Sequence, residues 1–158
     1  MSTKRLFLFV AFAILILLPA FGQGSSTDFA AAKGTLPAPI SGSYKVSKAF
    51  GTNVVGGIEL GSKGIFLTGK NGCHARAVYD GKVAAVYEFE SGYAVVLRHG
   101  SYLTVYARLE EVLVRQGQSI KALTNLGKVG RDAKGDRVLH FQLRQEREVL
   151  NPSQWLKL

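Results

Sequence analysis

Val138-Leu139-His140-Phe141-Gln142-Leu143-Arg144 is the stretch that decides the fold, because its apolar residues recur at every second position. That spacing predicts a half-buried β-strand with Leu139, Phe141 and Leu143 on the core face. Val138, His140, Gln142 and Arg144 share the other face. Two histidines at i and i+2 would project together and could hold a metal ion. Here Val138 takes the first of those places, and valine can neither ligate a metal nor move a proton. If the frame is that of a metal-dependent enzyme, this face favours binding over catalysis.

Further strand patterns surround this stretch and predict an all-β domain, an antiparallel sandwich or barrel. Short runs rich in Val, Tyr, Phe and Ile recur at close spacing and are separated by glycine. The expected strands are 57–60, 64–67, 74–79, 82–89, 93–99, 102–109, 119–123 and 126–129. Asp80-Gly81 predicts a two-residue hairpin, and His99-Gly100-Ser101 predicts a second tight connection. A terminal turn is expected at 152–155, with Trp155 packed on the sheet, and no segment has helical periodicity over three turns.

The strand at 102–109 predicts a polar surface beside the core. Alternation places Leu103, Val105, Ala107 and Leu109 on one face, which we expect to be buried. The other face would then carry Tyr102, Thr104, Tyr106 and Arg108. Together with the His140 face, this pattern fits either a binding groove or a solvated sheet, and strand chemistry alone does not separate the two.

The N-terminus predicts export. Lys4 and Arg5 precede an uncharged apolar run over 6–18, and small residues follow at 19–23, as in a secretory signal peptide spanning 1–22. The apolar run is shorter than the roughly 20 residues that a membrane span needs, although an uncleaved anchor is the alternative. No cysteine lies near the cleavage point, which argues against a lipid anchor. Residues 23–43 predict a linker or extended arm, and 44–158 the domain, in a periplasmic protein without a stable membrane span.

Charge and cysteine content narrow the function classes. The formal net charge is +9, and removal of Lys4 and Arg5 with the signal leaves +7. A basic exported domain favours anionic partners such as peptidoglycan carboxylates, anionic lipid surfaces or an acidic protein face, and nucleic acid is not expected outside the cytoplasm. Cys73 is the one cysteine, so no internal disulfide and no cysteine-rich metal site can form.

An ordered set of motifs resembles a known family. The set comprises Phe50-Gly51, 57–60, 77–83, 96–100, 102–109, 139–144, Asn151-Pro152 and Trp155-Leu156. Its order and spacing resemble the lysostaphin-like (LytM) zinc peptidases of peptidoglycan from about Leu36 to the end. The most diagnostic parts are Thr104–Leu109 and Leu139-His140-Phe141. The resemblance implies a β-sandwich or barrel-like domain with a groove, of the duplicated hybrid motif type.

The resemblance also implies where the family's zinc ligands and assisting histidines would fall. The first ligand corresponds to Val55 and the acidic ligand to Glu59. The histidine of the family's Tyr-Ala-His-Leu strand corresponds to Arg108. The first histidine of its His-x-His corresponds to Val138, and only the last ligand is retained, at His140.

These replacements predict a non-catalytic domain without zinc. A catalytic zinc needs about three protein ligands and an open position, and Glu59 and His140 supply two. Arg108 places a fixed positive charge where a cation would sit. His99 is expected to be structural. His74 and Cys73 are neighbours on a strand and face opposite ways, so a nucleophile pair is not expected.

Among similar sequences, loss of the ligands resembles the murein hydrolase activators of the EnvC type. The resemblance implies that the groove binds a cell-wall amidase, or another peptidoglycan hydrolase, and activates or recruits it. The expected groove residues are Val55, Glu59, Tyr106, Arg108, Val138, His140 and Arg144. Such activators usually carry a coiled coil before this domain, whereas here a short linker follows the signal. The alternatives are a peptidoglycan-binding module and, less favoured, a residual zinc endopeptidase.

Overall fold

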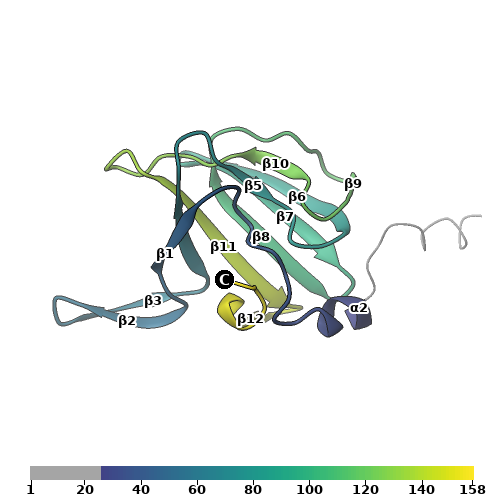
Figure 1. Ribbon diagram of the computed structural model, residues 1–158, viewed down its shortest axis with the longest axis horizontal. Helices are drawn as coiled ribbons and strands as arrows, with labels where there is room; N and C mark the ends of the chain where they lie inside the picture. The colour runs from purple at the N-terminus through teal and green to yellow at the C-terminus, as the bar shows by residue number, and fades with distance from the viewer. Residues whose placement is uncertain (1–25) are drawn as a thin grey trace, which may run out of the picture.

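The computed structural model describes residues 26–158, except for the side chains of 52–55, 59 and 60, so the predicted signal peptide lies outside the described residues. One large antiparallel sheet has the order β1-β4-β11-β8-β7-β6-β9, with β12 pairing β11 (Figure 1). Its strands are β1 (Tyr44–Lys48), β4 (Ile65–Gly69), β6 (Gly81–Phe89), β7 (Gly92–His99), β8 (Tyr102–Leu109), β9 (Ser119–Ile120), β11 (Arg137–Gln145) and β12 (Glu148–Leu150). The predicted all-β antiparallel class is confirmed.

Two small sheets complete the domain. β5 (His74–Arg76) pairs with β10 (Asn125–Lys128), and β2 (Gly51–Val55) pairs with β3 (Ile58–Ser62) in a hairpin that extends away from the large sheet (Figure 1). The hairpin predicted at Asp80-Gly81 is wrong, because β5 does not pair with β6. Asp80 instead accepts a hydrogen bond from the Ala122 amide, 2.7 Å away, at its Oδ1. The tight connection at Gly100 is confirmed, with Gly100 at φ 64° between β7 and β8.

One face of the large sheet packs on the core. Leu139, Phe141 and Leu143 of β11 are fully buried, as their alternation predicts. The core continues into β4, β7 and the β5–β10 sheet, where Leu67, Leu97 and Ala75 are also fully buried. The opposite face, which carries His140, is covered less completely and holds the candidate site.

The segment expected to be a linker or arm packs against this core from residue 26 onward. It contains the short helix α2 (Ser26–Ala31), which the sequence did not predict. Phe29 is fully buried and stacks on His99 and Trp155, with centroid distances of 4.8 and 5.4 Å. The predicted terminal turn is the 3₁₀ helix η2 (Pro152–Gln154), and Trp155 packs into the core as expected. Aromatic packing therefore joins the two ends of the described chain.

Candidate functional site

His140 lies near the middle of β11, between β4 and β8. It pairs in register with Phe66 on one side and Ala107 on the other. Its ring stacks on the Phe66 ring with centroids 4.3 Å apart and planes 5° apart. Nε2 is buried without a hydrogen-bond partner in the described part of the chain. Burial, followed by the charges of Arg108 and Lys48, lowers the pKa of His140, so the ring is neutral near pH 7.

Arg108 reaches this place through an unusual backbone. Its φ is +69°, in the left-handed region that non-glycine residues rarely adopt, and the β7–β8 register shifts beside it. The Gly130 amide donates to the Arg108 carbonyl at 2.8 Å and holds the distortion in place. The shift turns Arg108 away from the core, and its guanidinium lies 5.7 Å from the centre of the Phe66 ring. A strained residue held by its neighbours is a feature of functional sites.

A second cation lies over the same ring. The Lys48 ammonium, on β1, is 5.5 Å from the Phe66 centroid. Around these residues is a hollow of about 480 Å³, which we call the basic groove. Its lining residues are Lys45, Ser47, Lys48, Phe66, Thr68, Arg108, Asp132, Lys134, Asp136 and Val138. Four cations face two carboxylates there, so the groove favours an anionic ligand.

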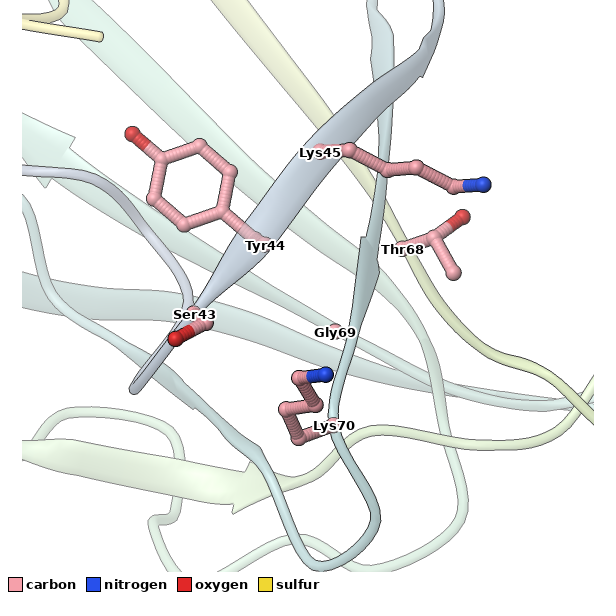
Figure 2. A pocket seen from close by; sticks show the side chains of 6 residues that line it. All are labelled: Ser43, Tyr44, Lys45, Thr68, Gly69 and Lys70. Carbon is pink, nitrogen blue, oxygen red and sulfur yellow. The ribbon is translucent and has the colours of Figure 1, made fainter.

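One of the two carboxylates, Asp132, already accepts hydrogen bonds within its own loop. Asp132 Oδ1 accepts hydrogen bonds from the Lys134 and Asp136 amides, both at 2.9 Å. A smaller hollow of about 360 Å³ adjoins the groove between β1 and β4 and shares Lys45 and Thr68 with it. Figure 2 shows these two side chains on one side of the strand pair and Tyr44 on the other. The basic surface therefore extends along the β1 edge of the sheet.

The structure corrects the expectation for Tyr106. We predicted a groove residue, but Tyr106 is fully buried in the core and its hydroxyl accepts from the Val78 amide at 3.0 Å. Burial raises its pKa. Over 102–107 the two faces of β8 are reversed relative to the prediction, because Tyr102, Thr104 and Tyr106 point inward, whereas after the register shift Arg108 is exposed and Leu109 buried, as predicted. Thr104 and Tyr106 can do so because their hydroxyls find hydrogen-bond partners inside the core.

Those partners form a buried polar chain that includes His99. Its Nδ1 lies 2.7 Å from the Asp80 carbonyl oxygen, and its Nε2 lies 2.8 Å from Thr104 Oγ1. The Thr104 and Tyr106 hydroxyls are 3.2 Å apart. A carbonyl can only accept, so Nδ1 carries the hydrogen, and a neutral ring accepts at Nε2 from the Thr104 hydroxyl. The predicted structural role of His99 is confirmed.

The other predicted polar residues lie elsewhere. Arg144 is on the same face of β11 as His140 but four residues along the strand, and it donates to Gln142 Oε1 at 3.2 Å. His74 lies 3.2 Å from the Ser41 hydroxyl at its Nδ1. Cys73 is buried, and burial raises the pKa of its thiol, which disfavours the reactive thiolate. The structure thus brings Arg108, Val138 and His140 together and leaves Arg144 at a distance.

Comparison with protein families matches residues 61–152 to Peptidase family M23. The chain belongs to peptidase family M23. The murein hydrolase activator NlpD of Escherichia coli is 31% identical to this M23 chain over 115 residues, which are 71% of this chain and 29% of NlpD. An uncharacterized protein of Neisseria meningitidis, NMB1333, is 32% identical over 138 residues, 86% of this chain and 22% of that protein. The M23 chain thus spans well under half the length of these relatives.

Solved structures agree on the fold of this M23 chain. A chain of the SpoIIQ–SpoIIIAH pore-forming complex aligns with a TM-score of 0.66 and 26% identity over 78% of this chain and 92% of that one. Lysostaphin of Staphylococcus simulans aligns with a TM-score of 0.58 and 21% identity, over 69% of this chain and 48% of that one, and shows the fold alone. The resemblance to lysostaphin-like domains and to murein hydrolase activators is confirmed.

Two predicted positions of the M23 site lie on the β2–β3 hairpin. Val55 pairs in register with Ile58, and Glu59 pairs with Val54, so both belong to a sheet separate from β11. Both precede residue 61, where the family match begins, and their side chains are not described. Their assignment as ligand positions stays a prediction. Within residues 26–158, apart from those side chains, no group of three or more His, Cys, Asp or Glu could hold a metal ion.

Phe66 and Lys48 are site residues that sequence reasoning missed. Phe66 lies in a predicted strand, and its position between Ile65 and Leu67 already placed it on the opposite face from those core residues. Lys48 lies on β1, which was not predicted, and reaches the ring because β1 pairs with β4. Both join the site through long-range pairing. No helix in the described range is long and apolar enough to cross a membrane.

Proposed function

We propose that this chain is a non-catalytic, exported M23 domain whose basic groove binds an acidic segment of a peptidoglycan hydrolase, an amidase above all, and so activates or recruits it. The observation that carries the proposal is the pair of cations, Arg108 and Lys48, over the one Phe66 ring that covers His140. Desolvated aromatic and arginine side chains provide most of the energy at protein interfaces. An acidic side chain entering the groove would meet both charges at once.

The same arrangement does not fit a catalytic zinc ion. In strand register His140 lies between Phe66 and Ala107, and the charges of Arg108 and Lys48 act on its ring; none of these four side chains is a zinc ligand. Glu59, if it reached the site, would make a second donor, one short of the three that a catalytic zinc takes. The charges of Arg108 and Lys48 oppose a divalent ion at short range. We therefore assign no hydrolytic step to this domain.

The relatives support an activating role at the cell envelope. NlpD is named a murein hydrolase activator. Escherichia coli YgeR is named a lipoprotein, and the Haemophilus influenzae relative an outer membrane antigenic lipoprotein. Together with the predicted signal peptide at 1–22, these names favour a periplasmic location. Activation would require tighter binding to the open state of the amidase than to its self-inhibited state.

The test is an amidase assay on purified cell wall with and without this protein. Arg108→Glu reverses the central charge of the groove and should abolish activation. Arg115→Glu makes the same charge change at an exposed position outside the groove residues and should leave activation intact. Equal loss in both variants, or full activation by Arg108→Glu, would contradict the proposal.

Direct binding to peptidoglycan is the second candidate, favoured by the excess of cations in the groove. A sedimentation assay separates the two functions. If insoluble cell wall retains the domain while no amidase binds or responds, the groove recognises peptidoglycan carboxylates. Metal analysis tests the third function: stoichiometric, tightly held zinc together with cleavage of a cross-linked muropeptide would restore a peptidase.

A further inference from the structure

A second set of cations crosses the same sheet face at the other end of its strands. Arg144 pairs in register with Leu103, Leu103 with Arg98, and Arg98 with Lys82. Directly opposed residues on neighbouring strands share a face, so these four side chains form one line across β11, β8, β7 and β6. We call Arg144, Arg98 and Lys82 the distal basic row.

Among the side chains that the structure describes, the distal basic row forms no ion pair with a carboxylate. Lys82 and Arg98 are exposed and directly opposite one another, an arrangement that destabilises a sheet when the charges are alike. Glu110 forms ion pairs with Lys128 and with Arg137, and neither pair involves the row. A hollow of about 470 Å³ adjoins Lys82 and Arg98 and is also lined by Gln116. Unneutralised cations beside a hollow favour an anionic ligand.

The row and the basic groove stand at opposite ends of one surface. Arg144 follows His140 by four residues on β11, which corresponds to about 13 Å along a strand. Between them the face presents half-buried Val105 and Val96, paired in register, and Ala107 beside His140. With Gln142 between His140 and Arg144 on β11, the surface runs from cations through aliphatic side chains and one amide to cations.

The backbone beneath this surface limits what can lie on it. β8 and β11 are interior strands with partners on both sides, so they offer no free backbone groups to an added strand. An extended peptide lying flat on the face would leave its own amides and carbonyls unpaired at the contact. A helix satisfies its backbone internally, so a helix suits such a face.

We propose that the occupant is an amphipathic helix of the partner hydrolase with acidic residues at both ends of its apolar face. One acidic end would contact Arg108 and Lys48, and the other would contact the distal basic row. Along β11 the separation of about 13 Å between His140 and Arg144 corresponds to roughly nine helical residues at 1.5 Å each. This inference rests on the proposed function and adds the second anchor, which determines the length and charge pattern of the segment recognised.

The experiment measures binding of the full-length protein to the activated amidase as a function of salt. The double variant Lys82→Glu/Arg98→Glu should weaken binding by about tenfold or more and flatten its salt dependence, because charges at the rim act through long-range attraction. Arg115→Glu/Lys121→Glu makes the same change in net charge at exposed residues outside the row and the groove, and should change affinity by less than about twofold.

Each result has one meaning. Loss with Arg108→Glu but not with Lys82→Glu/Arg98→Glu would overturn the second anchor and leave the proposed function standing. Loss with neither would overturn both. If the distal double variant instead lost binding to vesicles of anionic phospholipid while amidase affinity stayed unchanged, the row would serve a membrane surface and the inference would be wrong. Circular dichroism of every variant checks that the sheet remains folded.

Discussion

Acid should destabilise this domain through one buried histidine. Burial lowers the pKa of His99 from its ordinary value of 6.5 to about 4. The unfolded chain therefore binds a proton between these values while the folded chain does not. Stability contributed by the neutral ring is complete above pH 6.5 and is lost as the pH falls towards 4.

The size of the effect follows from the two pKa values. At pH 5 the unfolded histidine is almost fully protonated and the folded one is about a tenth protonated, which costs about 2 kcal/mol relative to pH 7.5. The pKa of His140 is also lowered, with burial as the largest cause, so His140 adds to the loss of stability at low pH. A loss of this size is a substantial part of the stability of a typical domain.

Urea unfolding at pH 7.5 and pH 5 measures this difference. His99→Gln keeps a polar side chain in the core without a titrating group, and should reduce the pH difference by about 2 kcal/mol. His140→Gln removes the second contribution and serves as the comparison, because its ring is less deeply buried. If His99→Gln retains the full pH difference of the natural protein, the histidine is not the group responsible and the reasoning fails.

Three further predictions concern packing and the groove. Phe29→Ala should lower the free energy of unfolding by about 3–5 kcal/mol, since Phe29 is fully buried, whereas exposed Phe89→Ala should change it by less than about 0.5 kcal/mol; urea titration measures both. Gly130→Ala would place a Cβ 2.7 Å from the Arg108 carbonyl oxygen, so we expect about 1–3 kcal/mol of destabilisation and weaker amidase binding by calorimetry. Arg108→Gly should raise stability by about 1 kcal/mol or less by relieving the positive φ, yet abolish activation in the amidase assay.

The core face of β11 could be predicted because apolar Leu139, Phe141 and Leu143 alternate with polar His140, Gln142 and Arg144. Leu139, Phe141 and Leu143 have no polar group to satisfy, so hydrophobicity alone assigns their face. β8 could not be predicted in the same way. Thr104 and Tyr106 look like surface residues until their partners are known, and those partners come from β7 and the segment before β6. A buried polar network reverses the apparent faces of a strand without changing its pattern.

The candidate site was predicted only in part, because some of its contacts also depend on partners that are distant in the sequence. His140, Val138 and Arg108 were identified from their motifs, and they do lie together. Phe66 and Lys48 depend on the pairing of β1 with β4 and of β4 with β11, which join segments up to about 90 residues apart in the sequence. The sequence also gives no sign that Arg108 adopts a positive φ, since Gly130, which holds it there, acts through the backbone.

The two faces of the large sheet have separate roles, and under the proposed non-catalytic function this separation would explain how a peptidase fold can persist without its chemistry. The buried face contains the polar chain from Asp80 through His99 to Tyr106, together with the aliphatic core, and provides the folding energy. The groove face carries cations whose removal costs folding little. Selection could therefore replace the family's assisting histidine with Arg108 without loss of the fold, provided that the Gly130 amide still supported the strained backbone at Arg108. On this view the strain is retained because it aims the guanidinium at the Phe66 ring, where the partner is recognised.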